Sequence, residues 1–150
     1  MRFGLVLAAM VLLSPRAHAS GGFWCDADDA KVVFSILSGV THGLGNPLFN
    51  FRGEMEIRDA AVAEDLRKSA YQIGNLTQHW LDAGELKMQL YRERGGDAPV
   101  GEVDLLIVTK ATDEATFEGS YTLRVSDMTG VTTGDAKTFE ATGKVACGAE

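Results

Sequence analysis

The chain has 150 residues, of which 14 are Lys or Arg and 21 are Asp or Glu, so its formal charge is −7. This excess of negative charge repels phosphate backbones and anionic lipid surfaces, and we expect the protein not to bind nucleic acid. The length suits one domain with its own hydrophobic core.

Residues 1–19 have the pattern of a secretory signal peptide. A short basic start is followed by the apolar run "FGLVLAAMVLLS", and Ala17 and Ala19 have the small-x-small spacing that a signal peptidase recognises. We expect cleavage between Ala19 and Ser20, which leaves residues 20–150 as a single β-domain in the periplasm or outside the cell. An uncleaved anchor is the alternative, but the run is shorter than the roughly 20 residues of a membrane-spanning helix. Loss of the leader leaves 12 basic and 21 acidic residues, a formal charge of −9.

The mature chain would hold two cysteines, one near each end, Cys25 and Cys147. Because an exported protein meets an oxidising environment, we predict that they form a disulfide bond. Such a bond would close nearly the whole mature chain into one loop, which the chain-entropy model values at roughly 4–5 kcal/mol. Free thiols with a redox role are the alternative, but no C-x-x-C motif is present.

Alternation of apolar and polar residues, which is typical of strands with one buried face, runs through the chain. It predicts about seven strands, at 31–42, 49–57, 71–80, 85–93, 102–110, 116–126 and 137–147. The parity of the third changes at Gly74-Asn75, which we interpret as a bulge. The fifth carries Leu106 and Val108 on its second face, as in a strand covered on both sides.

Short turns such as "DAG" (82–84) and "RGGDAP" (94–99) join successive strands and indicate antiparallel pairing. Helix-forming residues after Asp59 predict a short helical insert near 59–70, with an irregular crossover as the alternative. The fold class is therefore all-β: a small antiparallel β-sandwich or a partly closed β-barrel.

Three predicted strands have a glycine in the middle of their inward faces, namely Gly53, Gly119 and Gly143. Glycine within a strand usually marks a bend, a bulge or the close approach of another backbone. We interpret the three as a sign of strong coiling, which favours barrel-like closure, and large side chains such as Phe51 and Tyr121 could cover the gaps. The alternative is a ligand cavity lined by these glycines.

Motifs for catalysis, metals and cofactors are weak. The acidic stretch "CDADD" lacks the spacing of a calcium loop, and we expect no metal and no cofactor. No G-x-S-x-G elbow is present, so a catalytic triad would have to use His42 or His79 with residues from distant strands. Glu54 and Glu56 point the same way from one strand, which also describes the exposed face of any amphipathic strand.

The best candidate for a binding site is a surface patch made of His79, Trp80, Tyr91 and Arg92. The segments "TQHW" (77–80) and "LYRER" (90–94) flank one tight turn and should be neighbours in a hairpin. An exposed tyrosine with arginines nearby can stack on a sugar ring or anchor a protein partner. The alternative is that Tyr91 covers a sheet edge or a second small core.

Two functions remain compatible with these observations. The first is an exported, non-catalytic protein that binds a protein or a glycan, with inhibition of a basic hydrolase as one form. The second is a hydrolase whose site is assembled from separated strands. The sequence does not indicate the oligomeric state.

Overall fold

The segments with alternating apolar residues do form strands. The computed structural model describes residues 21–41 and 45–150, so the expected leader and His42 lie outside it. In chain order this part contains β1 (Gly21–Asp28), β2 (Val32–Val40), β3 (Leu48–Ile57), α1 (Glu64–Arg67), β4 (Lys68–Gln72), the 3-10 turn η1 (Ile73–Asn75), β5 (Leu76–Asp82), β6 (Glu85–Glu93), β7 (Gly101–Ala111), β8 (Thr116–Asp127) and β9 (Lys137–Ala149).

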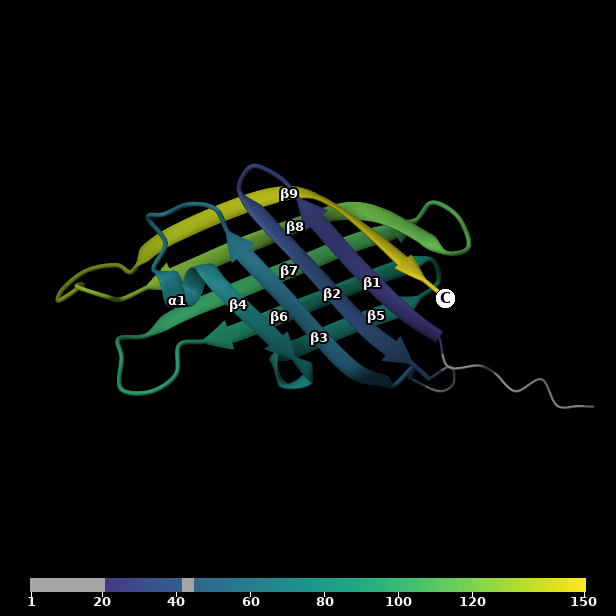
Figure 1. The fold of residues 1–150 in the computed structure, drawn as a ribbon, viewed down its shortest axis with the longest axis horizontal. Helices are drawn as coiled ribbons and strands as arrows, with labels where there is room; N and C mark the ends of the chain where they lie inside the picture. The colour runs from purple at the N-terminus through teal and green to yellow at the C-terminus, as the bar shows by residue number, and fades with distance from the viewer. Residues whose placement is uncertain (1–20, 42–44) are drawn as a thin grey trace, which may run out of the picture.

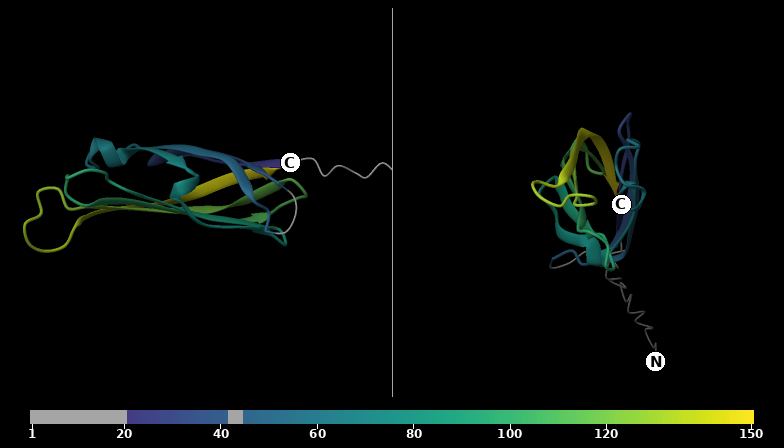
Figure 2. Two further views of the ribbon diagram at one scale, coloured as in Figure 1. Left: turned by 90° about the horizontal axis from the view of Figure 1, so that it is seen from below. Right: turned by 90° about the vertical axis from the view of Figure 1, so that its left-hand side faces the viewer.

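All strands belong to one antiparallel sheet that curls back on itself (Figure 1). Its order is β4-β3-β2-β1-β9-β8-β7-β6-β5, so consecutive strands are paired except β4 and β5, and β1 is paired with β9. The sheet is therefore closed between its first and last strands and open between β4 and β5. Figure 2 shows the result as two layers, with β1–β4 facing the longer strands of the other half. The predicted all-β, barrel-like fold is confirmed, with nine strands in place of about seven.

Two segments account for the difference in strand number. Residues 21–28 form a full strand between β2 and β9, whereas the first strand that the alternation predicted begins at residue 31. Phe23 does point into the core, but Trp24 points outward. The predicted strand 71–80 is in fact two strands, because η1 turns the chain where we expected a bulge, and β4 and β5 lie at opposite edges of the sheet.

The hydrophobic core lies between the two layers and is built from the inward side chains of every strand except β5. Among its largest fully buried members are Tyr71, Tyr121 and Leu105. On β7 the outward side chains of Leu106 and Val108 are exposed, so this strand is not covered on both faces as its composition suggested.

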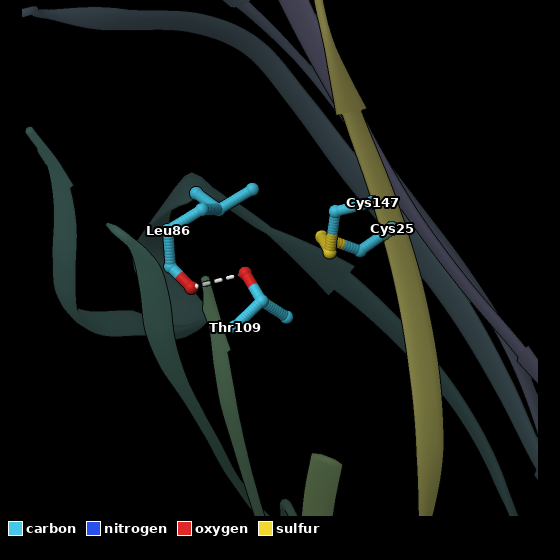
Figure 3. Close-up of a disulfide and its surroundings, with 4 residues drawn as sticks. All are labelled: Cys25, Leu86, Thr109 and Cys147. Carbon is cyan, nitrogen blue, oxygen red and sulfur yellow. Dashed lines mark hydrogen bonds between the residues drawn. A yellow bond between two sulfur atoms is a disulfide. The ribbon is translucent and has the colours of Figure 1, made fainter. Parts of the chain in front are cut away.

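A disulfide bond joins Cys25 of β1 to Cys147 of β9, as predicted, so the alternative of two free thiols is wrong. The two residues are directly opposite each other in the register, and both are buried. Figure 3 shows the sulfur atoms on the side facing Leu86 and Thr109 of the other layer. The buried Thr109 hydroxyl donates a 2.7 Å hydrogen bond to the Leu86 carbonyl oxygen, so this polar group is satisfied inside the core.

The inward glycines make room for the chain itself and not for a ligand. A Cβ at Gly119 would lie 2.0 Å from the Val108 carbonyl oxygen, so β7 and β8 could not keep their close approach with any other residue there. A Cβ at Gly53 would lie 3.1 Å from a side-chain carbon of Ile36. The coiling interpretation accounts for both positions, because the neighbouring strand fills the space beside each glycine.

The helical insert predicted near 59–70 is confirmed, although α1 itself has only four residues. Its Leu66 is fully buried between the layers. Arg94, at the end of β6, donates hydrogen bonds to Asp65 in α1 and to Asp127 at the end of β8, the latter at 2.9 Å. Arg94 therefore ties the insert to the opposite layer, and its guanidinium holds the pKa of both carboxyl groups below the usual range.

Candidate functional site: the outer faces of the two layers

The predicted patch residues occupy both sides of the β5–β6 hairpin. Trp80 is opposite Lys87 in the register, points outward and is 53 % exposed. Tyr91 lies on the same face of β6, four residues or about 13 Å from Lys87. Its hydroxyl donates a 2.7 Å hydrogen bond to Glu93, which raises the pKa of Tyr91.

His79 and Arg92 have the opposite parity. Arg92 donates hydrogen bonds to the Asp65 carbonyl oxygen at 2.9 Å and to the Ser69 hydroxyl at 3.3 Å, beside α1. His79 is opposite the buried Met88 but is itself exposed at the sheet edge. The structure thus places Trp80 on the outer face with Tyr91 and separates both from the other two, and the patch stays a prediction.

A concave surface lies on the outer side of the other layer, across β1–β4, and has a volume of about 680 Å³. The strand register arranges its outward residues in two rows that cross the four strands. The first row is Asp26, Ser35, Glu54 and Ala70, and the second is Asp28, Val33, Glu56 and Lys68. Residues of β2 form the floor, and the carboxylates of β1 and β3 stand on either side, about 10 Å apart at two strand spacings. We call this surface the acidic groove.

Positive charge is distributed unevenly along the acidic groove. Arg58 lies 2.6 Å from Asp28, and Lys68 is opposite Glu56 in the register. In the other row, Asp26 and Glu54 flank Ser35, and neither forms an ion pair with any residue in the ranges 21–41 and 45–150. A cation entering this row would meet one carboxylate on each side.

Next to the acidic groove, the same outer face carries three exposed apolar side chains, Trp24, Leu37 and Phe49, which we call the aromatic patch. They are 38 %, 38 % and 40 % exposed. The Trp24 ring lies against the backbone of Gly148 and the Phe49 ring against that of Gly39, where a Cβ would approach within 2.1 and 2.3 Å of the rings. The two glycines therefore let both rings lie close to the sheet and form a depression of about 340 Å³.

The turn between β1 and β2, at the end of the acidic groove, is anchored to the opposite layer through Asp29. Its carboxylate accepts hydrogen bonds from the Lys31 and Val32 amides and, at 2.5 Å, from the Tyr121 hydroxyl. Burial opposes ionisation, but these bonds outweigh it and lower the pKa of Asp29. A Cβ at Gly143 would lie 2.2 Å from the Asp29 carboxylate, so glycine there makes this anchor possible.

In the part of the chain that the structure describes, no three His, Cys, Asp or Glu side chains come together to hold a metal ion. No helix within the same ranges is long and apolar enough to cross a membrane. Glu54 and Glu56, the carboxylate pair considered for hydrolysis, lie together in the acidic groove, whereas His79, one of the two histidines considered for a triad, belongs to the other layer.

From the sequence alone, we expected the acidic residues of the groove to be ordinary solvated side chains. The parity that places Glu54 beside Glu56, and Asp26 beside Asp28, was visible in the sequence. What was missing was β1 itself, because without that strand the two acidic pairs have no reason to lie on one surface.

Comparison of the chain with protein-family models, with curated proteins and with solved structures found no match. Its function is therefore inferred from the geometry and charge of its outer faces.

Proposed function

We propose that the protein is exported, and that its mature domain is a non-catalytic binding protein that holds a basic segment of a protein partner on the outer face of β1–β4. The observation that supports this most is the row in which Asp26 and Glu54 flank Ser35, where neither carboxylate forms an ion pair within the part of the chain that the structure describes. Export is supported by the leader-like sequence, and the buried disulfide is compatible with an oxidising compartment.

The acidic groove and the aromatic patch complement each other as parts of one interface. Exposed aromatic side chains act as anchors for a partner, while unpaired charges increase the association rate and select the partner by charge. Successive rows on a strand are about 7 Å apart. A suitable segment would therefore place an apolar side chain on Trp24 and Leu37 and a lysine or arginine about 7 Å farther on, between Asp26 and Glu54.

A glycan is the other ligand to which exposed aromatic rings are suited. Stacking of a neutral sugar on Trp24 or Phe49 would not use the carboxylates of the acidic groove. The −9 formal charge of the mature chain favours a basic protein, because its field extends over the whole surface.

Affinity capture from the exported fraction of the native cell, with the mature protein as bait, tests the proposal. The doubly substituted bait D26N/E54Q removes two charges from the acidic groove. The matched control, E114Q/E118Q, removes two charges from exposed positions in and beside β8. We expect wild type and control to retain the same basic protein, and D26N/E54Q to lose it, with circular dichroism unchanged in all three.

Salt provides the second readout, because exposed charge pairs are screened at high ionic strength. We expect capture to weaken as salt is added. Equal capture by D26N/E54Q would contradict the placement of the site, and salt-insensitive capture of a glycan would contradict the basic partner.

The two tryptophans of the chain allow a direct measurement in solution. Replacing Trp80 by Phe leaves Trp24 as the only tryptophan, next to the acidic groove. Titration of W80F with the captured partner should change the Trp24 fluorescence, and the same titration of W80F/D26N/E54Q should need a higher partner concentration. An unchanged Trp24 signal at saturation would show that the partner binds elsewhere.

A further inference from the structure

The two edges of the open sheet differ in how they are covered. β4 has five residues, follows directly on α1, and its Ser69 hydroxyl is held by the Leu66 carbonyl oxygen and Arg92. β5 has seven residues, most of them exposed, and among the described residues it pairs with β6 alone. The edge at β5 is therefore the more accessible of the two.

The backbone groups that β5 leaves exposed can be identified. The Leu81 carbonyl oxygen accepts a 3.0 Å hydrogen bond from the Asn46 side chain, so it points away from β6. Backbone groups in an antiparallel strand alternate in direction, so the N–H and C=O of His79 point the same way. In the ranges 21–41 and 45–150, no backbone group is bonded to His79 on that side.

We infer that β5 is a dimerisation edge, which pairs with β5 of a second copy of this chain, antiparallel about a two-fold axis at His79. Exposed edges are normally protected by Pro or Lys, or by a cover, because their free backbone groups invite another strand. The sequence of β5, "LTQHWLD", contains no Pro, Lys or Arg and only one carboxylate. An antiparallel pair is two-fold symmetric, so one strand supplies both halves of the interface.

The register about His79 is favourable for the side chains on the outer face. Each Trp80 would lie opposite Gln78 of the second copy, and the two indole rings would be diagonal neighbours within reach of each other. The regular part of β5 comprises residues 78–82, because its pairing with β6 is irregular between Leu76 and Gln78. The two Asp82 carboxylates would lie at opposite ends of the paired strands and would not face one another. The exposed Val108, in the same row as Trp80 and Lys87, extends the apolar surface beside the axis.

The dimer would respond to salt in the opposite sense to partner binding on the β1–β4 face. Two copies with formal charges of −9 repel each other, and added salt screens this repulsion. Backbone hydrogen bonds and the contact of the Trp80 rings carry no charge. Salt should therefore strengthen the dimer while it weakens the binding of a basic partner, which makes the two proposals separable.

Sedimentation velocity of the mature protein over a range of concentrations, at low and moderate salt, tests the inference. We expect the sedimenting mass to rise from that of one chain to that of two as the protein concentration increases. Added salt should lower the protein concentration at which this change occurs. The substitution His79→Pro removes an N–H that points away from β6, so the β5–β6 ladder should remain and the dimer should be lost.

A second variant keeps the test decisive if H79P fails to fold. Trp80→Lys places a charge next to the proposed axis, and Thr122→Lys adds the same charge to the outer face of β8, away from the edge. We expect W80K to be monomeric and T122K to dimerise like wild type. A wild type that stays monomeric throughout, or a W80K dimer as stable as that of T122K, would overturn the inference.

Discussion

The sheet has two seams, between β1 and β9 and between β4 and β5, and they are closed by different means. At the first, Phe23–Asp26 pairs with Ala146–Ala149 and the buried disulfide joins the same two strands. At the second, side chains take the place of a backbone ladder: Asn46 bonds to the Leu81 carbonyl oxygen and Asn75 to that of Tyr91.

Farther along the second seam, Arg94 connects α1 to the opposite layer. A meander can therefore be closed by a disulfide at one seam and leave strand edges unpaired at the other. The β1–β9 seam depends on a covalent bond and apolar burial, so pH affects it little. The β4–β5 seam depends on polar and charged side chains and leaves the β5 edge accessible.

The largest expected effect comes from breaking the covalent seam. The variant C25A/C147A should lose about 4 kcal/mol of unfolding free energy, within a range of about 2–5, because the open chain has more conformational freedom when unfolded. Urea denaturation followed by circular dichroism measures this loss. Reductant should destabilise wild type and leave the variant unchanged. A midpoint shared by oxidised wild type and the variant would contradict the role given to the bond.

Removing the Arg94 link should be the next largest effect. Its side chain is 8 % exposed and that of Asp127 13 %, so R94M leaves a nearly buried carboxylate without its partner. We expect a loss of about 2 kcal/mol, less than for a fully buried pair because Asp65 is half exposed. The control R124M breaks the exposed pair of Arg124 with Glu140 and should cost only a few tenths of a kcal/mol.

The same link should make stability depend on pH. Arg94 lowers the pKa of Asp65 and of Asp127 in the folded state, so their contribution is present above the unfolded value of about 3.9 and is lost as the pH falls below it. Thermal unfolding from about pH 6 to about pH 3 should show a decrease in stability that is ~1 kcal/mol smaller in R94M. Parallel curves for the two proteins would mean that other groups cause the decrease.

The smallest effect is expected at the Asn46 contact. N46A removes one hydrogen bond, to a carbonyl oxygen near the edge of the sheet, and should cost about 1 kcal/mol. The same substitution frees the Leu81 carbonyl oxygen for a second copy of the chain. Urea denaturation and sedimentation measure the two consequences, and an N46A dimer weaker than that of wild type would argue against pairing through β5.

Much of this architecture could be predicted from local pattern. Strands such as β3 and β8 bury one face, so every second residue must be apolar, and that period is visible in the sequence. The disulfide followed from two cysteines and a leader. Helix propensity indicated the insert at α1, although only Leu66 is fully buried there.

Two features could not be predicted in this way. η1 depends on Asn75, whose side chain accepts from the Gln72 amide and donates to the Tyr91 carbonyl oxygen, a contact that exists only once β6 is in place. Four of the eight residues of β1 are acidic residues or glycine, and its strand conformation depends on partners at both ends of the chain. Because β1 was not predicted, the acidic groove that it helps to form was not predicted either.

Residue type and spacing along the chain were enough to predict the all-β class, the inward side chains of seven strand segments and the pairing of the two cysteines. Which outward side chains share a surface depends on the tertiary structure. Asp26 and Glu54 are 28 positions apart and come together through β2, while Trp80 and Arg92 are near in sequence and face different sides. Strand neighbours are determined by long-range pairing, so residues far apart in sequence come to share one outer face.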